Sequence, residues 1–313
     1  MIRIVALAAA LSLCIAAPSS AASSPVTPSA AAPVAATVPI LPAASFPFVP
    51  SASVHVDLDP PIPLSPGVRA IDVRIHAGND VIGGRFVEPE GGASHPGVLF
   101  VHWLGDPKTT NMTEFVPEAQ ALARRGVASL MIDAFWAKPN WFETGRSPAT
   151  DYADSLRQVA QLRAAIDALA AHPNIDGARL AFVGHDFGAM YGAVLSGLDA
   201  RIRFFVFIAG NPDFATWYLL GKKPADVAAY KRQMAPLDPL SYLRVSHGAD
   251  YLYQFGLKDQ YIPIDRAHRF FDASPSPKAL MFYAGGHALR SPLAVSDRIE
   301  WLLSRFGASG SAR

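Results

Sequence analysis

The chain has 313 residues, of which 50% are hydrophobic and 17% are charged, and its formal net charge is +1. This length and composition allow one large domain or two small ones, each with a buried core. The chain is too hydrophobic to be a disordered protein as a whole, and it lacks the excess of basic residues that is typical of nucleic-acid-binding proteins. The one cysteine, Cys14, lies near the N-terminus, so we expect no disulfide in the folded part.

The first 22 residues have the pattern of a secretory signal peptide. Arg3 supplies the positive start, and the apolar run over residues 4–17 is too short to span a bilayer comfortably. Small residues at 19–22 offer a cleavage site. Leu13 stands before Cys14, where a lipoprotein has a small residue, so we do not expect a lipid anchor.

Residues 23–52 consist mostly of Ala, Pro, Ser and Val and carry no charge. Such a segment has little to bury and predicts a disordered linker. We therefore expect an exported protein, periplasmic or secreted, with one folded domain over residues 53–313. No later apolar run reaches membrane length.

The domain begins with a predicted hairpin, in which residues 69–76 and 81–87 flank the turn residues Gly78-Asn79-Asp80. Short, continuously apolar runs follow. Runs of this kind are typical of strands buried on both faces of a parallel sheet. They cover residues 97–101, 127–132, 180–183, 202–208, 251–255 and 280–283.

Helical patterns separate these runs, at residues 115–125, 156–169 and 291–306. The alternation predicts an α/β protein with a doubly wound, mostly parallel sheet and a site at the carboxyl ends of its strands. Residues 211–248 interrupt the alternation. They predict a small helical lid over the strand ends, with a long crossover as the alternative.

A sharp strand-to-helix turn lies in the segment AFVGHDFGA, residues 181–189. A Cβ at Gly184 or Gly188 would crowd the helix against the strand. Such a turn forces its central residue, here Asp186, into strained backbone geometry and raises that side chain above the sheet edge. This position normally holds Ser or Cys, so Asp186 changes the chemistry that is available.

Two later turns could supply a base and an acid. His287 lies on a glycine-rich loop after residues 280–283, and Asp259 lies just past residues 251–255. A loop histidine can take a proton from water while a carboxylate holds its tautomer. Asp213, which follows residues 202–208, is the alternative acid.

Backbone donors for an oxyanion are expected from two turns. The N–H of either Trp103 or Leu104, after the first parallel strand, would be one donor, and the N–H of Phe187 the other. We expect His185 to be a packed neighbour of the site. The residues predicted to lie around the substrate are His102, Trp136, Trp217 and Tyr218.

On these residues the chain resembles the α/β-hydrolase superfamily from about Arg69 to Phe306, and it is most similar to the dienelactone-hydrolase-like and esterase-like branch. That branch uses Cys or Ser where this chain has Asp186. The segment Gly184-His185-Asp186 instead resembles haloalkane dehalogenases and epoxide hydrolases, in which Asp is the nucleophile. The resemblance implies a hydrolase with a triad of Asp186, His287 and Asp259.

An aspartate nucleophile restricts the reaction. Attack on an ester would give a reactive anhydride, whereas attack on an sp3 carbon gives an ordinary ester that water can hydrolyse with the help of His287. Halide release would favour indole donors, and epoxide opening would favour phenols. The sequence offers for these roles Trp103, Trp136, Trp141, Trp217, Tyr218 and Tyr261.

Three interpretations remain open. The first is a hydrolase of a small, apolar substrate in which Asp186 acts covalently or activates water, and the second is a carboxylic ester hydrolase of the dienelactone-hydrolase-like type. The third is a catalytically degenerate protein that binds a small molecule. The histidines lack ligand-like spacing, so we expect no metal, and we expect no other cofactor and no nucleic-acid partner. The oligomeric state stays open.

Overall fold

The computed structural model describes residues 40–47, 53–92, 94–106, 108–246 and 248–307. The predicted signal segment, 1–22, lies outside the described residues, as does most of the predicted linker, 23–52. Within that linker, a short 3-10 helix, η1 (Ala43–Ser45), leads to Phe46, whose buried ring packs edge-on against Tyr242. The linker prediction is wrong for residues 40–47, because Phe46 has an apolar core to enter.

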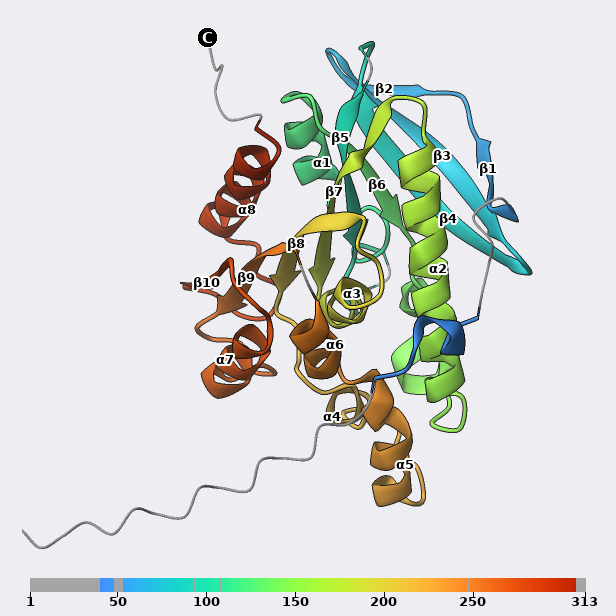
Figure 1. The fold of residues 1–313 in the computed structure, drawn as a ribbon, viewed down its shortest axis with the longest axis vertical. Coiled ribbons are helices and arrows are strands. Elements are labelled where there is room, and N and C mark those ends of the chain that lie inside the picture. Colours follow the sequence, from blue (N-terminus) through green and yellow to red (C-terminus); the bar gives the residue numbers. More distant parts are fainter. Residues whose placement is uncertain (1–39, 48–52, 93, 107, 247, 308–313) are drawn as a thin grey trace, which may run out of the picture. The chain divides into compact units, whose positions relative to one another are not determined.

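Ten strands of the described chain form one mixed sheet (Figure 1). Its order is β1-β3-β4-β6-β5-β7-β8-β9-β10, and β2 pairs with β3 beside β1. Strands β3, β4 and β6 pair antiparallel, and all neighbours from β6 to β10 pair parallel. The bounds are β3 Val68–Ala77, β4 Asp80–Pro89, β5 His95–Val101, β6 Ala128–Ile132, β7 Ile175–His185, β8 Ile202–Ile208, β9 Asp250–Gly256 and β10 Lys278–Tyr283.

Two strands of the sheet were not predicted, β1 (His55–Leu58) and β2 (Ile62–Ser65). Their side chains are exposed or half-buried, so no apolar pattern marks them in the sequence. The inner strands behave as expected. Along β5, Leu99 and Val101 enter one core, and Val98 and Phe100 enter the other, which explains why their sequence is apolar without alternation.

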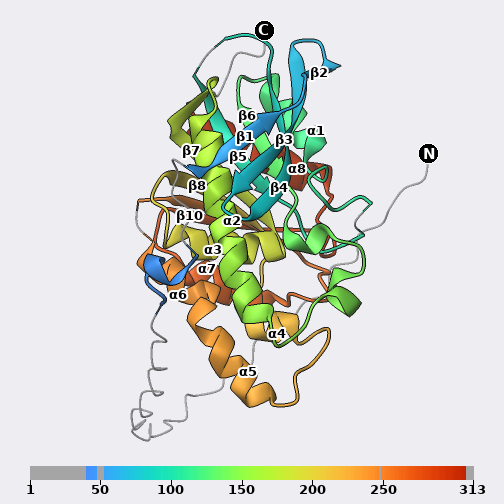
Figure 2. The same ribbon diagram turned by 90° about the vertical axis from the view of Figure 1, so that its right-hand side faces the viewer.

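Helices cover both faces of the sheet (Figure 2). Helices α1 (Val116–Ala123) and α8 (Pro292–Arg305) contact each other on one face. The other face carries α2 (Asp151–Ala171), α3 (Phe187–Ser196), α6 (Pro239–Val245) and α7 (Ile264–Ala273), the last of which was not predicted. The predicted doubly wound, mostly parallel sheet is confirmed. No helix in the described part of the chain is both long and apolar enough to cross a membrane.

The segment between β8 and β9 is helical, as the lid prediction requires. It contains α4 (Phe214–Tyr218), α5 (Val227–Met234), a 3-10 helix η5 (Ala235–Leu237) and α6. Helix α6 packs against α3 and so belongs to the layer on the sheet. Figure 1 shows α4 and α5 beyond α6, past the carboxyl ends of the parallel strands. The outer part of the segment is therefore α4 and α5.

Candidate active site

Asp186 lies at the sharp turn between β7 and α3, and its backbone has φ 56° and ψ −114°. A β-carbon on Gly184 would lie 2.4 Å from the backbone of Gly188, and one on Gly188 would lie 2.3 Å from the carbonyl oxygen of Val101. Only glycine allows the helix to start this close to the strands. The turn places a strained, buried carboxyl side chain at the carboxyl edge of the sheet.

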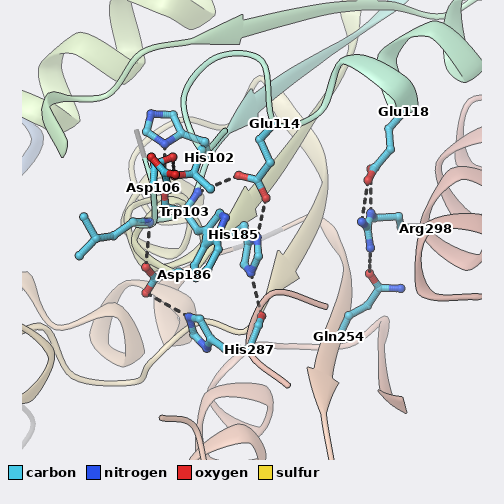
Figure 3. Close-up of polar contacts among 12 residues, drawn as sticks. His102, Trp103, Asp106, Glu114, Glu118, His185, Asp186, Gln254, His287 and Arg298 are labelled. Carbon is cyan, nitrogen blue, oxygen red and sulfur yellow. Dashed lines mark hydrogen bonds and ion pairs between the residues drawn. The ribbon is translucent and has the colours of Figure 1, made fainter. Parts of the chain in front are cut away.

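The structure brings His287 and Asp259 to this side chain. The Nδ1 atom of His287 lies 2.8 Å from Oδ2 of Asp259. Nε2, on the other side of the ring, lies 3.8 Å from Oδ1 of Asp186 (Figure 3). Burial lowers the pKa of His287, but the hydrogen bond with Asp259 and the charges of Asp186 and Asp259 outweigh burial and raise this pKa above its ordinary value. The hydrogen bond with Asp259 thus fixes the orientation of the His287 ring beside Asp186.

Asp259 is held on both of its oxygens. Besides Oδ2, which faces His287, Oδ1 accepts the backbone N–H groups of Tyr261 and Ile262 at 2.8 and 3.0 Å. Burial raises the pKa of Asp259, but these hydrogen bonds outweigh burial and hold the pKa below its usual value. The alternative acid, Asp213, instead caps α4 by accepting the N–H of Thr216 and does not contact His287.

Of the two donors left open after β5, the structure brings Leu104 to Asp186. The N–H of Leu104 donates to Oδ2 of Asp186 at 3.1 Å. The N–H of Trp103 donates instead to Oε2 of Glu114 at 3.0 Å, so Trp103 does not supply an oxyanion donor. The N–H of Phe187, at the start of α3, is among the groups that lower the pKa of the Asp186 carboxyl group.

The two oxygens of Asp186 therefore have different surroundings. Oδ2 occupies the donor site, whereas Oδ1 is buried and accepts no hydrogen bond from any described residue. Burial raises the pKa of Asp186, and the charge of His287 and the N–H groups of Leu104 and Phe187 offset part of that rise. The result is a carboxyl group with one oxygen bound and one oxygen free.

A cavity of about 650 Å³ opens onto Asp186 and His287. Its walls are mostly apolar, with several aromatic rings, and also include Asp106, Lys138, Asn140 and Glu143. They come from the loop after β5, from η3 (Phe135–Ala137) and η4 (Trp141–Gly145), and from the end of α4. The predicted residues Trp136 and Trp217 line it. Further lining residues are Trp103, Leu104, Trp141, Phe142, Leu220 and Tyr261. Such walls suit an apolar or aromatic ligand.

Two predicted substrate-binding residues lie elsewhere. His102 is buried, and its Nδ1 hydrogen-bonds to the carbonyl oxygen of Trp103 while its Nε2 accepts the N–H of Ala134. Tyr218 is fully buried in a hydroxyl cluster with Ser155 and Tyr191. Neither side chain lines the cavity, because each is held in a buried hydrogen-bond network. Apart from Trp103, the partners in these networks are distant in the sequence, so the sequence pattern does not reveal them.

Sequence reasoning missed Glu114 altogether. This side chain lies just before α1 and contacts both the loop after β5 and His185. It missed Phe142 as a cavity wall as well, although the aromatic pair Trp141-Phe142 after β6 was a usable signal. No group of three or more metal-ligating side chains is found in the described ranges.

No protein-family model matches the sequence, and no curated protein matches it. Solved structures do match. Acetyl xylan esterase from Paenibacillus sp. R4 superposes with a TM-score of 0.64 at 18% identity, over 84% of this chain and 90% of that one. Acetyl xylan esterase 1 from Thermoanaerobacterium sp. gives a TM-score of 0.64 at 15% identity, over 82% and 90% of the two chains.

A protein described as a putative dienelactone hydrolase from Klebsiella pneumoniae gives a TM-score of 0.58 at 16% identity, over 77% of this chain and 98% of that one. At these identities the likeness shows the fold. The chain has the α/β-hydrolase fold, as the resemblance predicted.

Proposed function

Proceeding from the α/β-hydrolase fold of this chain, we propose that it is a hydrolase whose nucleophile is Asp186. The substrate is a small, apolar molecule with a leaving group on an sp3 carbon, either a halide or an epoxide oxygen. His287 is the base and Asp259 orients it.

The asymmetry of the Asp186 carboxylate carries this proposal. Its Oδ2 sits on the N–H of Leu104, which is the position that a substrate oxyanion takes in an ester hydrolase. A substrate carbonyl oxygen cannot bind there while the protein's own oxygen does. Oδ1 accepts no hydrogen bond within the described ranges and so remains available to attack. This arrangement fits a nucleophile that itself becomes the ester.

The reaction then has two steps. In the first, Oδ1 forms a bond to the substrate carbon, and the electron pair of the breaking bond leaves with the halide or the epoxide oxygen. In the second, Nε2 of His287 takes a proton from water, and the hydroxide attacks Cγ of Asp186. The N–H of Leu104 stabilises the negative charge that develops on Oδ2. Collapse breaks the bond between Cγ and Oδ1, and the proton on His287 passes to the departing oxygen to give the alcohol. The new carboxyl group then loses its own proton to water, which restores the carboxylate.

The cavity offers donors for both kinds of leaving group. Trp103, Trp141 and Trp217 contribute indole rings to its wall, and Tyr261 contributes a phenol whose ring meets the ring of His287 edge-on at 5.2 Å. Tyr218, the other phenol considered from the sequence, is enclosed in the hydroxyl cluster and is not a proton donor here. Bromohexane and styrene oxide therefore serve as separate probes.

His287→Ala tests the covalent step, because removal of the base blocks the second step alone. We expect an alkyl adduct to accumulate on the peptide that contains Asp186, measured by mass spectrometry after incubation with each probe. The wild type in heavy-oxygen water should place the label first in Asp186 and only later in the alcohol. Asp186→Asn is the matched control and should form no adduct.

Two results would contradict the proposal in different directions. Hydrolysis of nitrophenyl acetate by the wild type, abolished in Asp186→Asn and without any alkyl adduct, would favour the carboxylic ester hydrolase. Absence of turnover and of adducts with both probes and the ester would favour a small-molecule-binding protein. Asp186→Ser adds a check, since its shorter side chain frees the Leu104 N–H for a substrate oxygen and should create ester cleavage.

A further inference from the structure

Behind Asp186 lies a second acid–histidine pair that the proposed reaction does not use. Nδ1 of His185 lies 2.7 Å from Oε1 of Glu114, and Nε2 of His185 lies 3.0 Å from the backbone carbonyl oxygen of His287 (Figure 3). Both side chains are shielded, with exposed fractions of 2% for His185 and 13% for Glu114. A buried polar pair this well bonded holds its surroundings in one arrangement.

The pair joins the two loops that complete the site. We call residues 102–105 the donor loop, since it carries the Leu104 N–H, and residues 284–288 the histidine loop. Glu114 binds the donor loop through the N–H of Trp103, and His185 binds the histidine loop through the carbonyl of His287. The ring of Trp103 stacks on His185 at 5.2 Å with an 18° angle between the planes.

The hydrogen positions follow from the partners. A carbonyl oxygen only accepts, so Nε2 of His185 must carry its proton. One oxygen of Glu114 accepts the N–H of Trp103, and the other lies against Nδ1 of His185. The pair also acts through charge. Glu114 is among the groups that raise the pKa of His287, and His185 is among those that lower the pKa of Asp186.

We propose that Glu114 and His185 are positioning residues that hold the donor loop and the histidine loop at a fixed spacing around Asp186. Neither side chain lines the cavity, so neither touches the substrate. Their effect reaches the reaction through the N–H of Leu104 and the ring of His287. The kinetic part of this inference rests on the proposed function, and a structural part is independent of it.

Glu114→Gln and Glu114→Leu form a matched pair for the test. Gln keeps an acceptor for Trp103 N–H and can donate to Nδ1 of His185, so it preserves the geometry and removes the charge, whereas Leu removes both contacts. His185→Phe keeps the stack on Trp103 and removes the hydrogen bonds. We expect kcat on bromohexane or styrene oxide to fall about 10- to 100-fold in Glu114→Leu and His185→Phe, with KM changed less than about twofold.

Glu114→Gln should retain kcat to within about threefold. Because Glu114 helps to raise the pKa of His287, the acidic limb of its pH–rate profile should move to lower pH. The double variant Glu114→Leu/His185→Phe should lose no more than either single variant, since both break one connection. Equal losses of kcat in Glu114→Gln and Glu114→Leu would overturn the positioning role. So would wild-type values of kcat and KM and a wild-type pH profile in both Glu114→Leu and His185→Phe.

The structural part needs no substrate. In nitrogen-15 spectra of the free protein, Glu114→Leu and His185→Phe should shift the Leu104 amide and the ring signals of His287, and Glu114→Gln should leave the Leu104 amide in place. Unchanged signals in all three variants would overturn the inference even if a substrate is found. Shifted signals would support it even if neither probe turns over, so the two proposals fail separately.

Discussion

At the residue scale, the buried carboxyl group of Asp186 lowers the stability of the fold at high pH. This residue is 2% exposed, one of its carboxyl oxygens accepts no hydrogen bond from the part of the chain that the structure describes, and burial raises its pKa. A carboxyl group with a raised folded-state pKa binds its proton more tightly in the native state than in the unfolded state. Its contribution to stability is complete below the unfolded pKa and is lost as the pH rises through the folded pKa.

Asp186→Asn should therefore stabilise the protein more at high pH than at low pH. The amide keeps an acceptor for the Leu104 N–H and carries no charge to desolvate. We expect a gain of about 1 kcal/mol in the free energy of unfolding at about pH 8, and a smaller gain at about pH 5, measured by urea denaturation. His287 adds to this pH dependence. Its pKa is raised, so the ring is positively charged at low pH, where it attracts the Asp186 carboxylate, and it loses that charge as the pH rises.

The exposed residue Asp272 provides the control, because Asp272→Asn makes the same chemical change outside the site. Its effect should be small and independent of pH between these two conditions. If Asp186→Asn instead lowers the free energy of unfolding at high pH, other contacts must stabilise the buried carboxylate. The prediction from its desolvation cost would then be wrong.

At the scale of the elements, the sharp turn from β7 to α3 depends on Gly184 and Gly188, because only glycine lets the backbone segments approach this closely. The first turn of α3 runs directly over the end of β5, so a β-carbon on Gly188 would meet a backbone oxygen rather than a flexible side chain. Backbone cannot move aside without shifting the donor loop that follows β5. The close approach is what brings Leu104 within reach of Asp186.

Gly188→Ala should thus destabilise the protein by about 3 kcal/mol. In a domain of this size that corresponds to a fall in Tm of roughly 10 °C, measured by thermal unfolding. Gly83→Ala on β4 is the control, since its β-carbon would make an ordinary 3.7 Å contact with Asp133. Equal Tm values for the two variants would show that the turn relaxes without cost.

At the scale of the whole molecule, a buried ion pair joins α8, the last described helix, to α1 and to β9. Arg298 on α8 binds both oxygens of Glu118 on α1, at 2.8 and 2.6 Å, and donates to Gln254 on β9 at 3.0 Å (Figure 3). Arg298 and Glu118 are both buried. The attraction within such a pair roughly offsets the free-energy cost of removing both charges from water. Replacing only one partner is strongly destabilising, because the other charge is then buried without a partner.

Arg298→Met should lower the free energy of unfolding by about 3–5 kcal/mol, because Glu118 is then buried without a partner. The double variant Glu118→Leu/Arg298→Met should recover most of that loss, since it leaves no buried charge. Urea denaturation of the wild type and of both variants measures the difference. A double variant as unstable as Arg298→Met would show that packing rather than charge governs the contact between α1 and α8.

The elements that the sequence predicted are those whose burial is set locally. The inner strands from β5 to β9 are largely buried on both faces where their sequence is continuously apolar, and α2 shows as one apolar stripe. Strand β10, at the other edge of the sheet, is apolar in sequence but only half-buried. Strands β1 and β2 lie at the edge with exposed side chains and leave no such signal. The burial of Phe46 has no local signal either, because its partner, Tyr242, is nearly two hundred residues away in the sequence.

The site divides in the same way. The spacing of glycines and the order of turns point from the sequence alone to Asp186, Asp259 and His287, because a strand end, a turn and a functional side chain are local features. Which of two adjacent N–H groups reaches Asp186 depends on Glu114, eleven residues past Trp103, and on how the loop folds back. The sequence determined the fold class and the kinds of group at the strand ends. Only the tertiary structure decided which oxygen of Asp186 is bound and which is free, because long-range hydrogen bonds are satisfied in space and not along the chain.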